Sequence, residues 1–151
     1  MGVARLFLFK LILVTSICQY AQSEELSTGQ HQIPGYLGQI QAHTPMELES
    51  IFQRVDDLLK DDSQYHLNQP LALVLHGEEV RLFLRRNYQD HQSLVDQAAR
   101  LEAFNAIDIQ VCETWLRDAN VDKSELPAFV NTVPYGPDRE EELLEQGYEY
   151  F

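Results

Sequence analysis

Apolar and polar positions change their spacing along the chain in a regular order, which predicts alternating strands and helices. Residues 71–75 form a continuous apolar run after Pro70, as is typical of a strand buried on both faces. In residues 107–112, isoleucine and valine alternate with polar residues and a cysteine, which is the period of two of a strand. Further strands are expected at residues 36–43, 129–133 and 148–151.

Helical spacing fills the segments between these strands. Thr44, Pro45 and Glu47 have the pattern of a helix start: a capping hydroxyl, a proline in the first turn, and a carboxylate three residues after the threonine. Apolar residues then recur every three or four positions up to Lys60, which predicts an amphipathic helix. Further helices are expected at residues 78–86, 90–104, 114–118 and 138–146, with Asn105 ending the second of these and Gly147 the last.

Strands that alternate with helices are typical of βαβ units, in which the strands run parallel and helices cover both faces of the sheet. The sequence therefore predicts an α/β fold. We expect residues 36–151 to form a single three-layer α/β/α domain, with a mostly parallel sheet of about five strands.

The N-terminal segment has the composition of a targeting sequence. Two basic residues flank an apolar run at residues 11–17, and residues 21–23 resemble a small-x-small cleavage site. The run is too short to span a bilayer. We interpret residues 1–23 as a cleaved secretory signal, with a retained anchor as the alternative, and residues 24–35 as a flexible leader. The protein is expected to be exported to the periplasm and free of the membrane after cleavage.

Acidic residues outnumber basic ones by 24 to 11, giving a formal net charge of −13. A surface of this charge repels phosphate backbones and anionic membranes. Nucleic-acid binding is therefore not expected. If the acidic surface binds a partner, we expect that partner to present a basic face.

The chain has two cysteines, and signal cleavage would leave only Cys112, which could then form no internal disulfide. Cys112 ends a predicted strand and precedes a predicted helix. Ligands bind at the carboxyl ends of strands in open α/β sheets, and the start of a helix favours the thiolate. Three interpretations stay open: a reactive thiol, a cysteine paired with another chain, and a buried inert residue.

Two histidines are expected at the same edge of the sheet as Cys112. His43 follows the first predicted strand and His76 follows the second. A histidine beside the thiol could accept its proton, which is the usual activation of a cysteine nucleophile. The structural alternative is that His76 caps the next helix or bonds a backbone carbonyl, and that His43 only precedes a helix start. Candidate binding residues follow strands at this edge: Gly77, Tyr135 and Gly136.

A metal site is a weaker hypothesis. His43, His76 and Cys112 are ligand types that suit zinc or copper, but the chain has no short-spaced ligand pair. No metal and no cofactor are therefore predicted. Nothing in the sequence resembles a Ser-His-Asp set, a phosphate-binding glycine loop or a nucleotide fingerprint.

Five short motifs follow one another along the predicted domain: Leu-Val-Leu-His-Gly at 73–77, Asn-Tyr at 87–88, Val-Cys-x-Thr-x-Leu at 111–116, Val-Pro-Tyr-Gly at 133–136 and Gln-Gly-Tyr at 146–148. In order and spacing they resemble the DsrE/DsrF-like family. The resemblance implies a three-layer α/β/α domain that assembles into small homo-oligomers. It also implies that Cys112 carries sulfur as a persulfide and exchanges it with a thiol or persulfide partner protein.

The chain departs from that family in two respects. The family's sulfur relays are intracellular, whereas this chain carries a predicted export signal. Glu113 follows the cysteine where relatives often have a small or amide residue, and a carboxylate there opposes the thiolate.

The leading interpretation is a DsrE/DsrF-like protein in which Cys112 is a sulfur carrier or redox-active thiol, supported by His76 and His43. The main alternative is a non-enzymatic oligomeric binding domain with a structural cysteine. A His/Cys metal-binding protein is the less favoured one.

Overall fold

The computed structural model describes residues 33–60 and 69–151. The predicted signal at residues 1–23 lies outside these ranges, as does the predicted leader up to residue 32. Within the described ranges, no helix has the length and apolar character needed to cross a membrane.

The described residues include one five-stranded sheet of order β4-β3-β2-β1-β5, in which every pairing is parallel. Its strands are β1 (Tyr36–Leu37), β2 (Leu71–Leu75), β3 (Ile107–Cys112), β4 (Asn131–Val133) and β5 (Glu149–Tyr150). The α-helices are α1 (Pro45–Lys60), α2 (Tyr88–Ala103), α3 (Glu113–Asp118) and α4 (Gly136–Glu145). The 3₁₀ helices are η1 (Glu78–Phe83), η2 (Arg85–Asn87) and η3 (Lys123–Glu125).

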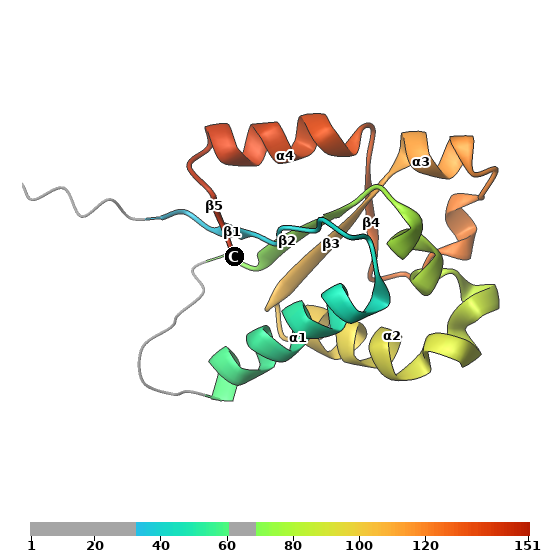
Figure 1. The fold of residues 1–151 in the computed structure, drawn as a ribbon, viewed down its shortest axis with the longest axis horizontal. Helices are drawn as coiled ribbons and strands as arrows, with labels where there is room; N and C mark the ends of the chain where they lie inside the picture. Colours follow the sequence, from blue (N-terminus) through green and yellow to red (C-terminus); the bar gives the residue numbers. More distant parts are fainter. Residues whose placement is uncertain (1–32, 61–68) are drawn as a thin grey trace, which may run out of the picture. The chain divides into compact units, whose positions relative to one another are not determined.

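Helices cover both faces of the sheet, with α1 and α2 on one face and α4 on the other (Figure 1). The apolar residues of β2 pack on both faces of the sheet because successive side chains of a strand point in opposite directions. Leu73 and its alternate neighbours pack in the larger core with α1 and α2. Ala72 and Val74 pack in a smaller core with Leu143 of α4. The predicted three-layer α/β/α domain is confirmed.

The first strand is shorter than predicted. A strand was expected over residues 36–43, but β1 covers only Tyr36–Leu37. The backbone N–H groups of Gln41 and Ala42 donate to the Glu47 carboxylate, at 2.7 and 2.9 Å, instead of to a neighbouring strand. The chain therefore leaves the sheet early and turns into α1.

Other boundaries differ by a few residues. The strand expected at residues 129–133 begins at Asn131, because the Val130 N–H bonds to the Pro127 carbonyl in a turn. The last strand is Glu149–Tyr150 rather than residues 148–151. The short helix expected at residues 78–86 consists of the two 3₁₀ helices η1 and η2.

The residues predicted to end two helices do so in the left-handed conformation. Asn105, with φ of 56°, follows α2, and Gly147, with φ of 90°, follows α4. Each N–H bonds back to the helix, Asn105 to Glu102 at 2.7 Å and Gly147 to Leu144 at 2.9 Å. Carbonyls left free at the helix ends are thus satisfied.

A buried carboxylate joins α1 to α2. Asp56 of α1 is only 7% exposed and accepts hydrogen bonds from Arg100, at 2.7 Å, and Gln97, at 2.8 Å. The hydrogen bond from Arg100 is the main cause that holds the pKa of Asp56 below its usual value. This pairing satisfies a charge that would otherwise be costly to bury.

Candidate functional site

Three residues were predicted from the sequence to carry chemistry, and all three lie at the carboxyl edge of the parallel sheet. His76 follows β2, Cys112 ends β3, and His43 lies in the loop between β1 and α1. Gly136 begins α4 just after β4. This is the edge at which open α/β sheets bind ligands.

Gly136 brings the start of α4 against both His76 and Cys112. A Cβ added to Gly136 would lie 3.0 Å from the His76 Cβ and 3.3 Å from the Cys112 Cβ. Both distances are tight for real side chains, so the absence of a side chain allows this approach. His76 and Cys112 are therefore neighbours across the first turn of α4.

The Cys112 thiol lies beneath the surface. The residue is a free cysteine with 2% exposure. It occupies the cap position of α3, but that helix has only six residues and receives no side-chain cap bond. The longer helix whose start approaches Cys112 is α4, through Gly136, which the sequence analysis had placed at this edge as a binding residue.

The carboxylate after the cysteine is held by other groups. Glu113 accepts hydrogen bonds from Lys123 and, at 2.8 Å, from the Thr132 hydroxyl. The hydrogen bond from Lys123 is the main cause that lowers the pKa of Glu113. Lys123 therefore offsets the negative charge that was expected to oppose a thiolate at Cys112.

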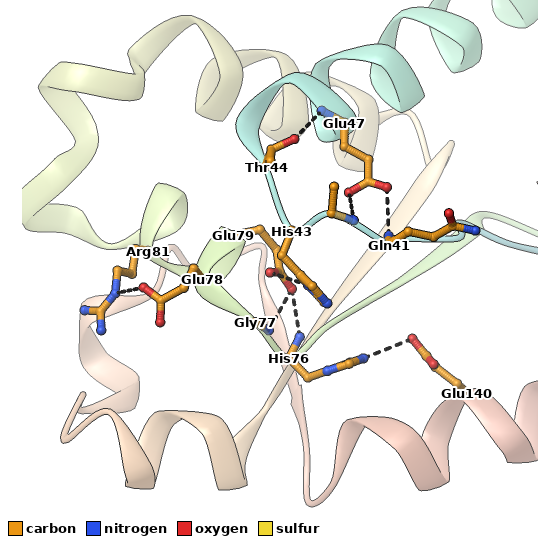
Figure 2. A network of polar contacts seen from close by, with 11 residues as sticks. Gln41, His43, Thr44, Glu47, His76, Gly77, Glu78, Glu79, Arg81 and Glu140 are labelled. Atoms are coloured by element: carbon orange, nitrogen blue, oxygen red, sulfur yellow. Dashed lines mark hydrogen bonds and ion pairs between the residues drawn. The ribbon is translucent and has the colours of Figure 1, made fainter.

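A buried glutamate organises the histidine side of the site. Glu79 has a fully buried side chain, and its Oε2 lies 2.7 Å from the Nδ1 of His43. Its Oε1 accepts from the backbone N–H groups of His76 and Gly77, each at 2.9 Å. Figure 2 shows these contacts converging on one carboxylate. Glu79 thus joins the loop before α1 to the turn after β2.

Gly77 makes room for this arrangement. A Cβ added to Gly77 would lie 2.4 Å from the His43 Nδ1 and 2.5 Å from the Glu79 Oε2, closer than real Cβ atoms come. Its N–H is already engaged by Glu79. Gly77 therefore acts here through its small size and its backbone bond.

The two histidines form the solvent-facing part of the site. Their rings meet edge to face with centroids 5.3 Å apart, and their side chains are 31% and 29% exposed for His43 and His76. The Nε2 of His76 lies 3.5 Å from a carboxylate oxygen of Glu140 on α4 (Figure 2). The N-cap residue of η1 is Gly77, and the N–H groups of His76 and Gly77 are bonded by Glu79, so the alternative in which the His76 ring caps this helix gains no support.

Tyr135 lies beside the site, in an open groove of about 560 Å³ along β4 and α4. The Tyr135 side chain lines this groove and is 46% exposed. On its floor, Arg139 donates to the Gln110 side chain at 2.9 Å. The groove is lined by Gln110, Asn131, Thr132, Val133, Pro134, Tyr135, Asp138, Arg139 and Glu142.

Two site residues were missed by the sequence analysis, namely Glu79 and Glu140. Glu79 follows Glu78 in what reads as an ordinary acidic helix start, and Glu140 stands in an acidic run. Their partners come from distant elements, so no local pattern distinguishes them.

The metal hypothesis gains no geometric support. Over residues 33–60 and 69–151, no group of three or more His, Cys, Asp or Glu side chains is placed to hold a metal ion.

Comparisons with known proteins bear on the fold. No family model matches the sequence, and no curated protein sequence matches it. Among solved structures, the chain is similar to MTH1491, a protein of unknown function from Methanobacterium thermoautotrophicum. The match has 15% sequence identity and a TM-score of 0.57, and covers 77% of this chain and 93% of that chain. At this identity the likeness supports the three-layer α/β/α fold alone.

Proposed function

We propose that this chain is a DsrE/DsrF-like sulfur carrier in which Cys112 holds a persulfide and His76 exchanges its proton. One observation carries the proposal: Cys112 and His76 both lie against Gly136 at the carboxyl edge of the sheet. That arrangement supplies a thiol, a neighbouring base and the positive end of a ten-residue helix at one place.

The uptake step needs no further group. The Cys112 thiol passes its proton to the His76 imidazole, and the thiolate attacks a sulfane sulfur of a polysulfide. The sulfur–sulfur bond of the donor breaks, and its electron pair leaves with the shortened polysulfide. In the release step, an acceptor nucleophile attacks the outer sulfur and Cys112 leaves as a thiolate, which recovers its proton from His76.

The low exposure of Cys112 favours a second candidate function. At 2% exposure, Cys112 also fits a binding domain in which the cysteine is only a core residue. The two candidates differ in the folded protein. A carrier opens enough to admit a polysulfide, whereas a core cysteine resists both polysulfide and alkylating reagents.

Intact mass tests the proposal. The full chain is incubated with polysulfide beside Cys112→Ser, and Cys18→Ser serves as the matched cysteine control. Because Cys18 of the full chain is itself a thiol, the decisive pair is Cys18→Ser, which should gain sulfur that a reductant removes, and the double variant Cys18→Ser/Cys112→Ser, which should gain none. Equal uptake by Cys18→Ser and the double variant, or no uptake by Cys18→Ser with full resistance to alkylation, contradicts the carrier.

The proposal extends to location and assembly. The pattern of residues 1–23 supports export, and the family resemblance supports a small homo-oligomer. Cell fractionation and sedimentation of the purified protein test these two points separately. A cytoplasmic location of the mature chain contradicts the first, and a monomer at all concentrations contradicts the second.

A further inference from the structure

The contact between Glu79 and His43 fixes which nitrogen of His43 carries the hydrogen. An ionised carboxylate can only accept hydrogen bonds, and Glu79 already accepts two from the backbone. Its third partner is the Nδ1 of His43 at 2.7 Å, and we infer that this nitrogen donates to the carboxylate. In the neutral ring this leaves Nε2 with a free lone pair, able to accept a proton.

His43 is held in place from two sides. Its backbone has a φ of 51°, a conformation that side-chain-bearing residues rarely adopt and that costs energy. Glu47 fixes the preceding loop through the N–H groups of Gln41 and Ala42, while Glu79 fixes the ring. Figure 2 shows both carboxylates flanking the loop. Such strain persists where the surrounding contacts impose it, often at functional sites.

The ring that is held in this way is linked to Cys112 through one neighbour, His76. His43 meets His76 edge to face, and His76 and Cys112 share the contact with Gly136. Of these three residues, the two histidines are partly exposed to solvent and the cysteine is buried.

We propose that the Nε2 of His43 accepts the proton of a protic nucleophile that removes sulfur from Cys112, and that Glu79 is the positioning residue for this step. The inference rests on the proposed function and adds a second base to it. His76 serves the Cys112 thiol, and His43 serves the incoming molecule.

With a thiol as the acceptor, one proton passes to His43 and one sulfur atom passes to the thiol. The proton of the incoming thiol moves to the His43 Nε2 as its sulfur attacks the outer sulfur of the persulfide. The bond between that sulfur and the Cys112 Sγ breaks, and its electron pair stays on the Cys112 thiolate. The imidazolium of His43 is stabilised by the carboxylate of Glu79 and later loses its proton to water. Sulfite, which attacks as an anion, has no proton to give up.

The test compares these two nucleophiles on sulfur-loaded full-length protein that carries Cys18→Ser throughout, so that Cys112 is its one cysteine, with 2-mercaptoethanol as the thiol. The variants are Glu79→Gln, which keeps an acceptor for the backbone but turns an amide N–H₂ toward His43, and His43→Gln. Glu78→Gln is the matched control, because Glu78 is the neighbouring glutamate, is exposed, and pairs with Arg81 at 2.6 Å rather than with His43.

At about pH 7.5, only about a tenth of an ordinary thiol with a pKa near 8.5 is ionised, so both variants should release sulfur to the thiol up to about 10-fold more slowly than wild type. Release to sulfite should be unchanged, and the gap for the thiol should close as pH rises past the pKa of the thiol. Glu78→Gln should match wild type. Equal slowing with both reagents, or no slowing with the thiol, overturns the inference and leaves the carrier intact.

A second measurement is independent of sulfur transfer. Nitrogen-15 NMR of the neutral wild-type ring should show the hydrogen of His43 on Nδ1, and Glu79→Gln should move it to Nε2. A wild-type ring with its hydrogen on Nε2 overturns the inference whatever the transfer rates. Failure of the wild type to load sulfur at Cys112 overturns the carrier and, with it, the role given to His43.

Discussion

His43 and Glu79 are 36 residues apart in the sequence, yet the Nδ1 of one lies 2.7 Å from the Oε2 of the other. The same carboxylate bonds the backbone after β2. One buried side chain thus holds together the loop before α1, the turn after β2 and the two histidines.

Replacement of Glu79 by alanine should destabilise the fold. Two backbone N–H groups and the His43 ring would lose their acceptor. Because water can replace part of the lost hydrogen bonding, we expect the free energy of unfolding to fall by about 1–3 kcal/mol in total. Urea unfolding measures the loss. Glu78→Ala, on the exposed neighbour, should change the unfolding free energy by less than about 0.5 kcal/mol. Equal effects of the two substitutions would contradict the role of Glu79.

Gly77→Ala should displace His43. The added Cβ would lie 2.4 Å from the His43 Nδ1, so either the ring or the backbone after β2 has to move. We expect a destabilisation of about 1–3 kcal/mol. His43→Ala in the same chain should relieve part of it, which a double-mutant cycle of unfolding free energies detects. If the two changes in unfolding free energy are strictly additive, residue 77 and His43 are not energetically coupled and the account is contradicted.

Asp56 should make stability depend on pH in the acidic range. Its pKa is lowered in the fold, mainly by the hydrogen bond from Arg100, so its contribution is present above the unfolded pKa of about 3.9. That contribution is lost as pH falls through the lower, folded pKa. The gap in unfolding free energy between wild type and Asp56→Asn should therefore narrow on acidification from about pH 7 to pH 3. A gap of constant size over this range would contradict the stabilising role given to the ionised Asp56.

Gly136→Val should push the start of α4 away from the site. Even a single Cβ would lie 3.0 Å from His76 and 3.3 Å from Cys112, and valine adds two methyl groups to it. We expect about 1–3 kcal/mol of destabilisation and slower sulfur uptake by Cys112. Gln146→Val, at the exposed far end of the same helix, is the control and should affect neither. Unchanged uptake in folded Gly136→Val would show that the closeness of α4 is not needed.

Much of the fold could be predicted because its signals are local. The apolar run of β2 and the alternation in β3 follow from burial, and Asn105 and Gly147 end their helices because each adopts a positive φ with little strain. The placement of His76 and Cys112 at one edge followed from parallel strands alone. The early end of β1 did not, because it depends on Glu47 bonding the backbone before α1.

The side-chain contacts within the site could not be predicted from local sequence patterns. Glu79 finds His43 only because β1 and β2 are neighbours in the sheet, which orders the loops that follow them. Gly136 reaches Cys112 because β4 pairs with β3 and α4 then returns over the sheet. Both contacts depend on strand order, and a single sequence read by spacing does not fix that order.

The central claim is that Cys112 carries sulfur, and the most direct measurement locates that sulfur in the chain. Folded full-length protein is treated with polysulfide, its sulfhydryls are blocked by alkylation, and the peptide that contains Cys112 is identified by mass spectrometry. The account predicts a sulfur atom inserted between the Cys112 Sγ and the alkyl group, removed when reductant precedes the alkylation. A Cys112 peptide that is alkylated only after unfolding, with no added sulfur, would contradict it.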